Sequence, residues 1–149
     1  MTAPKIRSAT PASLVLRLLA SVYDLLPLLA LWFAAVVLAL ALTGGALDVR
    51  RLADKMLVQA LAFGVCIAYF VVSWTRGGQT IGMKSWRLRV VRDDGRSPDI
   101  VHALLRFAVA IVSLAPAGLG FWWALFDAQG RTWHDIAAGT LVVRMEKER

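Results

Sequence analysis

A long apolar run near the start of the chain constrains the fold most strongly. Residues 14–42 read LVLRLLASVYDLLPLLALWFAAVVLALAL and contain only two charged residues, Arg17 and Asp24. Because about 20 apolar residues are enough to cross a bilayer, this run predicts a membrane-spanning helix. A carboxylate at the centre of a spanning helix costs at least ~2.5–3.5 kcal/mol, so we expect Asp24 to face a partner, a cavity or a transport path.

The composition agrees with a membrane protein. Apolar residues make up 58% of the 149 residues and the mean hydropathy is +0.62, whereas soluble domains are about 45–50% apolar. The net charge of +7 does not indicate nucleic-acid binding, because the basic residues cluster beside apolar runs, where they set membrane topology. The single cysteine, Cys66, excludes an internal disulfide and is expected to be a small packing residue.

The chain divides into a polar leader (1–13), a membrane domain (14–144) and a charged tail (145–149). The fold class we predict is an all-α membrane protein with two transmembrane helices plus a third broken or re-entrant membrane region, with short cytoplasmic strand-like segments. The first run is too long for a signal-peptide core and should remain as a helix. Pro27 should kink that helix near Tyr23 to Pro27, and a second span is expected over Met56–Trp74.

The third apolar region, 100–126, has two interpretations. Pro116, Gly118 and Gly120 interrupt it, so it is either one kinked span or a hairpin that turns back. If it turns back, both termini lie inside, and of the 17 basic residues only Arg50, Arg51 and Lys55 lie outside. The positive-inside rule favours this arrangement, although a region of this length could cross with some tilt.

Two short segments have strand-like patterns. Trp86, Leu88 and Val90 alternate with arginines up to a turn at Asp94-Gly95, and 140–144 reads TLVVR. If the third region turns back, the two segments lie on the same face of the membrane. For 86–92 an interfacial segment with Trp86 in the headgroups is an equal alternative.

Arg17, Asp24 and Arg106 form the first candidate site, an intramembrane charge network. Arg17 and Asp24 share a helix face, but a rise of ~1.5 Å per residue separates them by about 10.5 Å along the axis. We therefore expect Asp24 to pair with Arg106, which should lie at a similar depth. A buried ion pair that fixes helix packing is the main interpretation, and a proton or cation site is the alternative.

The second candidate is an interfacial polar cluster of Asp127, Arg131, His134 and Asp135, which would share one face if helical. We expect it to cap helix ends, and His134 could respond to pH. One histidine is too few for a metal site, so no metal or cofactor is expected.

A third motif, the glycine-rich loop around Thr80, Gly82 and Lys84, lacks the P-loop spacing. Since no nucleophile motif is present either, we expect no enzyme activity.

Four segments in order resemble the RDD family of small bacterial membrane proteins. They are RLLASVYD (17–24), QTIGMK (79–84) leading into LRVV (88–91), LLR (104–106), and FD (126–127) followed by RTWHDIAAGT (131–140). The resemblance implies that Arg17 is the arginine of the family name, Asp24 its first aspartate, and Asp127 or Asp135 its second. It also implies a bacterial inner (plasma) membrane location. The family's biochemical role is generally undefined, with transport, including sodium–proton exchange, suggested for some members.

Two functions remain open from the sequence. The first is a non-catalytic integral membrane subunit, oligomeric, that acts as an accessory or scaffold in a membrane complex. The alternative is a small oligomeric ion or proton-coupled transporter that uses Asp24, since two or three helices cannot enclose a pathway alone. The expected partners are the bilayer, with anionic lipids at the cytoplasmic face, and a second copy or another membrane protein.

Overall fold

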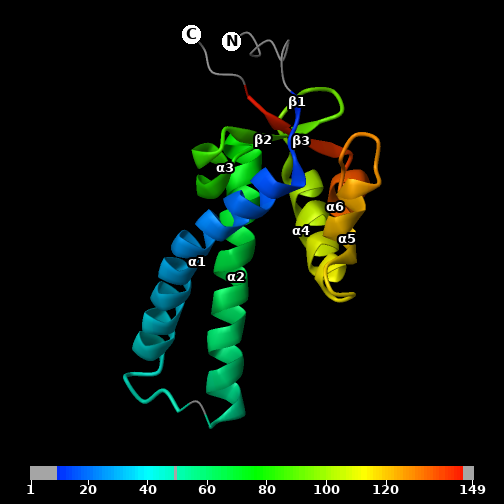
Figure 1. The fold of residues 1–149 in the computed structure, drawn as a ribbon. Coiled ribbons are helices and arrows are strands. Elements are labelled where there is room, and N and C mark those ends of the chain that lie inside the picture. The colour runs from blue at the N-terminus through cyan, green and yellow to red at the C-terminus, as the bar shows by residue number, and fades with distance from the viewer. Residues whose placement is uncertain (1–9, 49, 146–149) are drawn as a thin grey trace.

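A computed structural model describes residues 10–48 and 50–145. Two long helices form a hairpin, and a small sheet with several short helices lies at the end of the hairpin opposite its connecting loop (Figure 1). This arrangement confirms the predicted fold class. Of the predicted leader and tail, only residues 10–13 and residue 145 fall within the described part of the chain.

The two long helices are candidate membrane spans by length and composition. Helix α1 comprises Leu14–Leu42 and α2 comprises Leu52–Gly77. Helix α1 has the predicted bounds, whereas α2 extends past Met56–Trp74 at both ends because polar residues continue the helix there. Many large side chains of α1 are exposed, among them Leu26 and Phe33 at 71% and 69%, as suits contact with lipid.

Helix α1 is continuous through Pro27. Figure 1 shows that its first turns run at an angle to the remainder of the helix. Proline has no N–H to donate to the carbonyl four residues earlier, which permits such a bend. The first turns of α1 therefore lie against the sheet end of the molecule while the rest of the helix extends away from it.

The third apolar region is broken, as the Pro/Gly cluster predicts. Helix α4 (Ile100–Leu114) is followed by α5 (Leu119–Trp122) and the 3₁₀ helix η1 (Trp123–Leu125), and the chain bends by 111° at the break. Ala117 and Gly118 both have left-handed backbone conformations there, with φ of 52° and 76°. Helices α4 and α5 pack against each other beside α6 (Trp133–Ala137) (Figure 1).

The sheet joins the two described ends of the chain. Its strands are β1 (Thr10–Pro11), β2 (Leu88–Arg92) and β3 (Thr140–Arg144), in the antiparallel order β1-β3-β2. The strand-like patterns are thus confirmed as paired strands at 140–144 and at 88–92, whereas Trp86 and Arg87 of the predicted segment 86–92 lie in the turn before β2. Leu88 and Val90 are completely buried (0% exposed), so β2 is part of the core and not an interfacial segment.

The core lies where the sheet meets the helices. Leu88, Val90 and Val142 of the sheet pack against Ala20 of α1 and Trp74 of α2. The short helix α3 (Ile81–Ser85), which follows α2, packs against α1. This region holds the buried charged side chains of the described residues. The other half of the α1–α2 hairpin, toward the loop that connects the two helices, is called its free half.

Candidate functional site

Asp135 is bound by two arginines from different helices. Its Oδ2 accepts a hydrogen bond from Nη1 of Arg17 at 2.6 Å, and its Oδ1 accepts one from Nη1 of Arg106. Exposure of the three side chains is 10% for Arg17, 5% for Arg106 and 0% for Asp135. The carboxylate therefore connects α1, α4 and α6 through charge-assisted hydrogen bonds shielded from solvent.

Neutral groups complete the coordination of this ion cluster. Thr132 precedes α6, and its backbone N–H and Oγ1 donate to Asp135 Oδ2 at 3.0 and 2.8 Å. Arg106 Nη1 also donates to Thr140 Oγ1 at 2.8 Å, and its guanidinium carbon lies 5.1 Å from the centre of the Trp74 ring. Such supporting contacts are what make a buried ion pair tolerable, because they offset the desolvation of the charges.

The cluster shifts the pKa values of the two titratable residues in α6. Burial alone would raise the pKa of Asp135, but the positive charges of Arg106 and Arg17 hold it well below its usual range. Burial, followed by the nearby charge of Arg106, lowers the pKa of His134 to about 3. His134 is therefore neutral near pH 7. A buried imidazole beside two guanidiniums resists protonation, so the pH response expected for His134 should appear through the stability of the fold and not through its charge in the folded protein near pH 7.

Within the described residues, Asp24 is bound by neutral donors only. Its Oδ1 accepts from Tyr69 Oη at 2.5 Å and from the Gly82 N–H at 2.8 Å, and its Oδ2 accepts from Thr80 Oγ1 at 2.6 Å. The carboxylate is 4% exposed. Three hydrogen bonds replace those to water that the Asp24 side chain loses on burial.

The glycine-rich loop motif around Thr80 and Gly82 supplies two of the three hydrogen bonds to Asp24. Thr80 is the N-cap of α3, and its Oγ1 also accepts from the Met83 N–H at 3.1 Å. A Cβ added at Gly82 would lie 2.0 Å from the Ala20 carbonyl oxygen, so only glycine permits this approach of α3 to α1. Lys84, the third residue of the motif, is exposed on α3.

The predicted pairing of Asp24 with Arg106 is wrong. Arg106 bonds to Asp135, and Asp24 bonds to α3 and to Tyr69. The prediction assigned partners by depth in the membrane. It left out α6, which carries Asp135 back to both arginines, and α3, whose free N–H group satisfies Asp24.

The predicted interfacial cluster separates into two parts. Asp127 and Arg131 lie in a turn, where Asp127 Oδ2 accepts from the Arg131 N–H at 2.9 Å and from Arg131 Nε at 3.3 Å. His134 and Asp135 belong to α6 and are buried. The prediction that the four residues share one helical face is therefore wrong. The chain around Gly130, which has a φ of 65°, is not helical.

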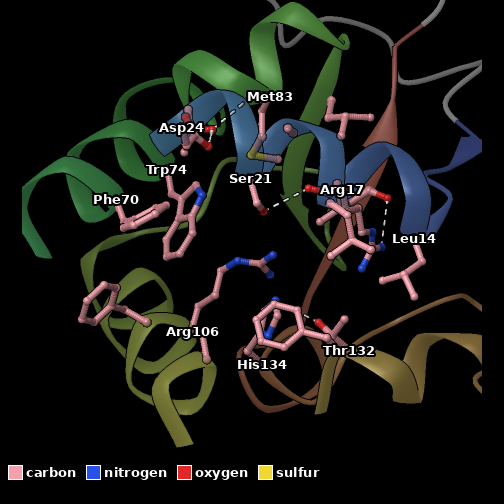
Figure 2. Close-up of a pocket in the computed structure, with 18 of the residues that line it drawn as sticks. Leu14, Arg17, Ser21, Asp24, Phe70, Trp74, Met83, Arg106, Thr132 and His134 are labelled. Carbon is pink, nitrogen blue, oxygen red and sulfur yellow. Dashed lines mark hydrogen bonds between the residues drawn. The ribbon is translucent and has the colours of Figure 1, made fainter. Parts of the chain in front are cut away.

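A cavity of about 250 Å³ lies between these groups. Figure 2 shows Arg106 reaching into it, with Arg17 and Asp24 on α1 and His134 near Thr132 on the opposite side. Helices α1 and α4 each pack against α2 and leave the cavity between them. Its walls are mostly apolar, so the site combines buried charges with space for an apolar group.

The family model that describes RDD family proteins matches residues 11–139. The chain belongs to the RDD family. This match confirms the resemblance drawn from the four segments and identifies a small membrane protein. No curated protein and no solved structure matches the chain. Of the two candidates for the second RDD aspartate, Asp135 is buried against Arg17, whereas Asp127 lies in the turn.

Several residues of this RDD site were missed in the sequence. Tyr69, Thr132 and Thr140 each bind one of the buried charges. Tyr69 could have been identified from the sequence, because a tyrosine hydroxyl within a membrane span needs a hydrogen-bond partner. Thr132 gave another, since threonine three residues before Asp135 fits a helix N-terminus with an acidic third position.

Proposed function

We propose that this RDD protein is a non-catalytic membrane subunit that acts as an accessory or scaffold within a larger membrane complex. The observation that carries the proposal is that hydrogen bonds within the chain hold both buried carboxylates, Asp24 and Asp135, in fixed positions. Asp24 has three neutral donors, and Arg17 and Arg106 share Asp135. A carboxylate that carries a moving proton or cation must exchange partners, and these contacts instead fix helix positions.

The free half of the hairpin supports the partner interaction. Leu26 and Phe33 of α1 are largely exposed, and Phe63 of α2 is 53% exposed although its ring lies 5.9 Å from that of Phe107. A second copy of the chain or another membrane protein could pack on these faces, with lipid filling the remainder. The small side chains of Ala35 and Ala39 are already buried within the chain, so an additional helix would meet the larger ones.

We place the protein in the bacterial inner membrane with both ends on the cytoplasmic side. Pairing of β1 with β3 supports a common side for the two ends. The sparse basic residues between the two spans support an outside location for that loop. The arginines near the sheet would then meet anionic lipids of the cytoplasmic leaflet.

A small oligomeric ion or proton-coupled transporter is the second candidate. The cavity beside Asp24 favours it, since both Asp24 and Arg106 line this space. Transport would require the contacts of Asp24 with Tyr69 and α3 to open during each cycle.

A flux measurement separates the two functions. Purified wild-type protein in sealed vesicles, under an imposed sodium or proton gradient, should show no flux above empty vesicles. Flux that scales with protein, disappears in a folded Asp24→Asn variant and persists in the matched Asp127→Asn variant would overturn the accessory role. In parallel, a tagged chain should retain the same membrane partner through purification, and a Leu26→Ala/Phe33→Ala variant should lose it.

A further inference from the structure

The cavity between α1 and α4 opens through an apolar rim. Leu18 of α1 and Ile111 and Leu114 of α4 line it and are 46%, 41% and 61% exposed. Such an opening on a membrane protein admits an acyl chain at little cost, because the chain leaves one apolar environment for another.

The polar groups at the inner end of the cavity include unused hydrogen-bond donors. Both hydrogen bonds of Arg106 to described residues use Nη1, and its Nε is buried without a partner among the described residues. Trp74 Nε1 and Arg17 Nε are likewise unpartnered within that part of the chain. A guanidinium has five donors and an indole N–H only donates, so a ligand here must supply acceptor oxygens.

The net positive charge around Arg106 favours binding of an anion. Arg17 and Arg106 share the single carboxylate of Asp135, which leaves this cluster with one net positive charge. His134 is neutral near pH 7. Asp24 is held at the other end of the cavity by Thr80, Tyr69 and Gly82 and makes no ion pair among the described residues. An anion is therefore stabilised at Arg106 and repelled near Asp24.

We propose that the cavity binds the anionic group of a membrane lipid. A phosphate oxygen would accept hydrogen bonds from Arg106 Nη2 and, after small side-chain shifts, from Trp74 Nε1. The first methylenes of the acyl part would pass Leu18 and Ile111 into the bilayer. A volume of about 250 Å³ lies just below the ~300–1,000 Å³ of pockets that enclose drug-sized ligands, so it suits part of a lipid and not a whole one. This site goes beyond the accessory role and does not depend on it.

The test uses the full chain, purified in neutral detergent and titrated with a phosphatidylglycerol. Bound lipid is counted by native mass spectrometry. We expect saturable binding of one lipid per chain with at least tenfold higher affinity than for a phosphatidylcholine of the same acyl chains. Inorganic phosphate at the same concentration should neither bind nor compete.

Matched variants distinguish the cavity from the arginines on the protein surface. Ile111→Trp fills the opening, whereas the neighbouring Val112→Trp adds the same side chain outside the cavity lining, at a residue that is 64% exposed. The first variant should weaken phosphatidylglycerol binding at least tenfold and the second should not. Leu18→Trp with Leu19→Trp as its control repeats the comparison from α1 if Ile111→Trp does not fold.

Three results would overturn the proposal. Equal affinity for phosphatidylcholine and phosphatidylglycerol would show that the negative charge of the headgroup does not contribute to binding. Competition by inorganic phosphate at equal concentration would identify a simple anion site. Unchanged lipid binding in both cavity-filling variants would place the lipid on the outer surface.

Discussion

Asp135 Oδ2 accepts a hydrogen bond at 2.6 Å from Nη1 of Arg17, a residue 118 positions earlier in the chain. Together with Arg106, this pair connects three helices through a single buried carboxylate. Removing one partner of a buried ion pair typically costs ~3–5 kcal/mol, because the other charge stays buried without compensation.

We expect Asp135→Asn to be severely destabilising. It leaves two guanidiniums without a counter-charge, so the free energy of unfolding should fall by ~3–5 kcal/mol. Asp127→Asn is the control, since the ion pair of Asp127 within the described residues is with the half-buried Arg131 at 3.3 Å, and it should cost far less than Asp135→Asn. Denaturant unfolding in detergent measures both. Similar losses for the two variants would contradict the structural role of Asp135.

A double-mutant cycle should identify the true partner of Arg17. Arg17→Gln and Asp135→Asn should be coupled by ~0.5–3 kcal/mol, as residues in direct contact are. The cycle between Asp24→Asn and Arg106→Gln should show weaker coupling, because the two side chains do not bond to each other. Strong coupling between Asp24 and Arg106, with none between Arg17 and Asp135, would support the pairing predicted from the sequence.

Gly82→Ala should separate α3 from α1. The new Cβ would lie 2.0 Å from the Ala20 carbonyl oxygen and 2.9 Å from Asp24 Cγ, and forced overpacking usually costs ~1–3 kcal/mol. Gly77→Ala is the matched control, since no atom lies within 4 Å of its added Cβ. Thermal midpoints in detergent should fall for Gly82→Ala alone. An unchanged midpoint would mean that α3 is not held against Asp24.

His134 should make stability fall as the pH is lowered. Its pKa is about 3 in the folded protein and ~6.5 in the unfolded chain, so the unfolded state binds the additional proton between these values. The stabilisation is complete above pH ~6.5 and declines by up to ~1.4 kcal/mol per pH unit below it. The groups that face the ring are Thr132, Phe121 and the Arg17–Asp135–Arg106 cluster.

Unfolding at about pH 7.5 and about pH 5 measures this dependence. His134→Gln should flatten it, whereas His102→Gln, which changes a histidine beside Asp99 at the start of α4, should not. An equal slope in wild type and His134→Gln would exclude His134 as the cause.

Both ends of the chain should lie on the cytoplasmic side. A reporter that is active only in the periplasm should stay silent when joined after Arg149, because β1 pairs with β3 in one sheet and the positive-inside rule favours the cytoplasmic side for both ends. The same reporter joined after Gly45, in the loop between α1 and α2, should be active and serves as the positive control. Activity at both positions would require the third region to cross the membrane.

The elements of the fold could be read from local sequence patterns. The bounds of α1, the break after Leu114 and the strands at 88–92 and 140–144 follow from apolar length, Pro/Gly content and alternation. The partners of the charges could not be read this way. Periodicity fixes the face on which Asp24 lies. Two of its three partners, Thr80 and Gly82, belong to the N-cap and first turn of α3, a helix of five residues that is too short for a periodic signal.

The arginine partners of Asp135 also could not be predicted from local sequence patterns, because they are distant in the chain. The spacing of Asp135 from Asp127 predicts a shared helical face at the membrane interface, yet the chain turns at Gly130 and within 127–137 only 133–137 are helical. Its pairing with Arg17 depends on where β3 places α6 against α1. That position is a property of the assembled sheet and cannot be obtained from spacing within either segment.

The middle position of β3 in the sheet has a consequence for biosynthesis. Strands β1 and β2 both pair with β3 and not with each other, and β3 is the last of the three to leave the ribosome. Until then β2 has no neighbouring strand and β1 has none either. Helix α1 therefore enters the membrane long before Arg17 meets its counter-charge on α6. We expect the sheet to close in one late step, and a nascent chain that stalls before Thr140 should leave the edges of both strands unpaired.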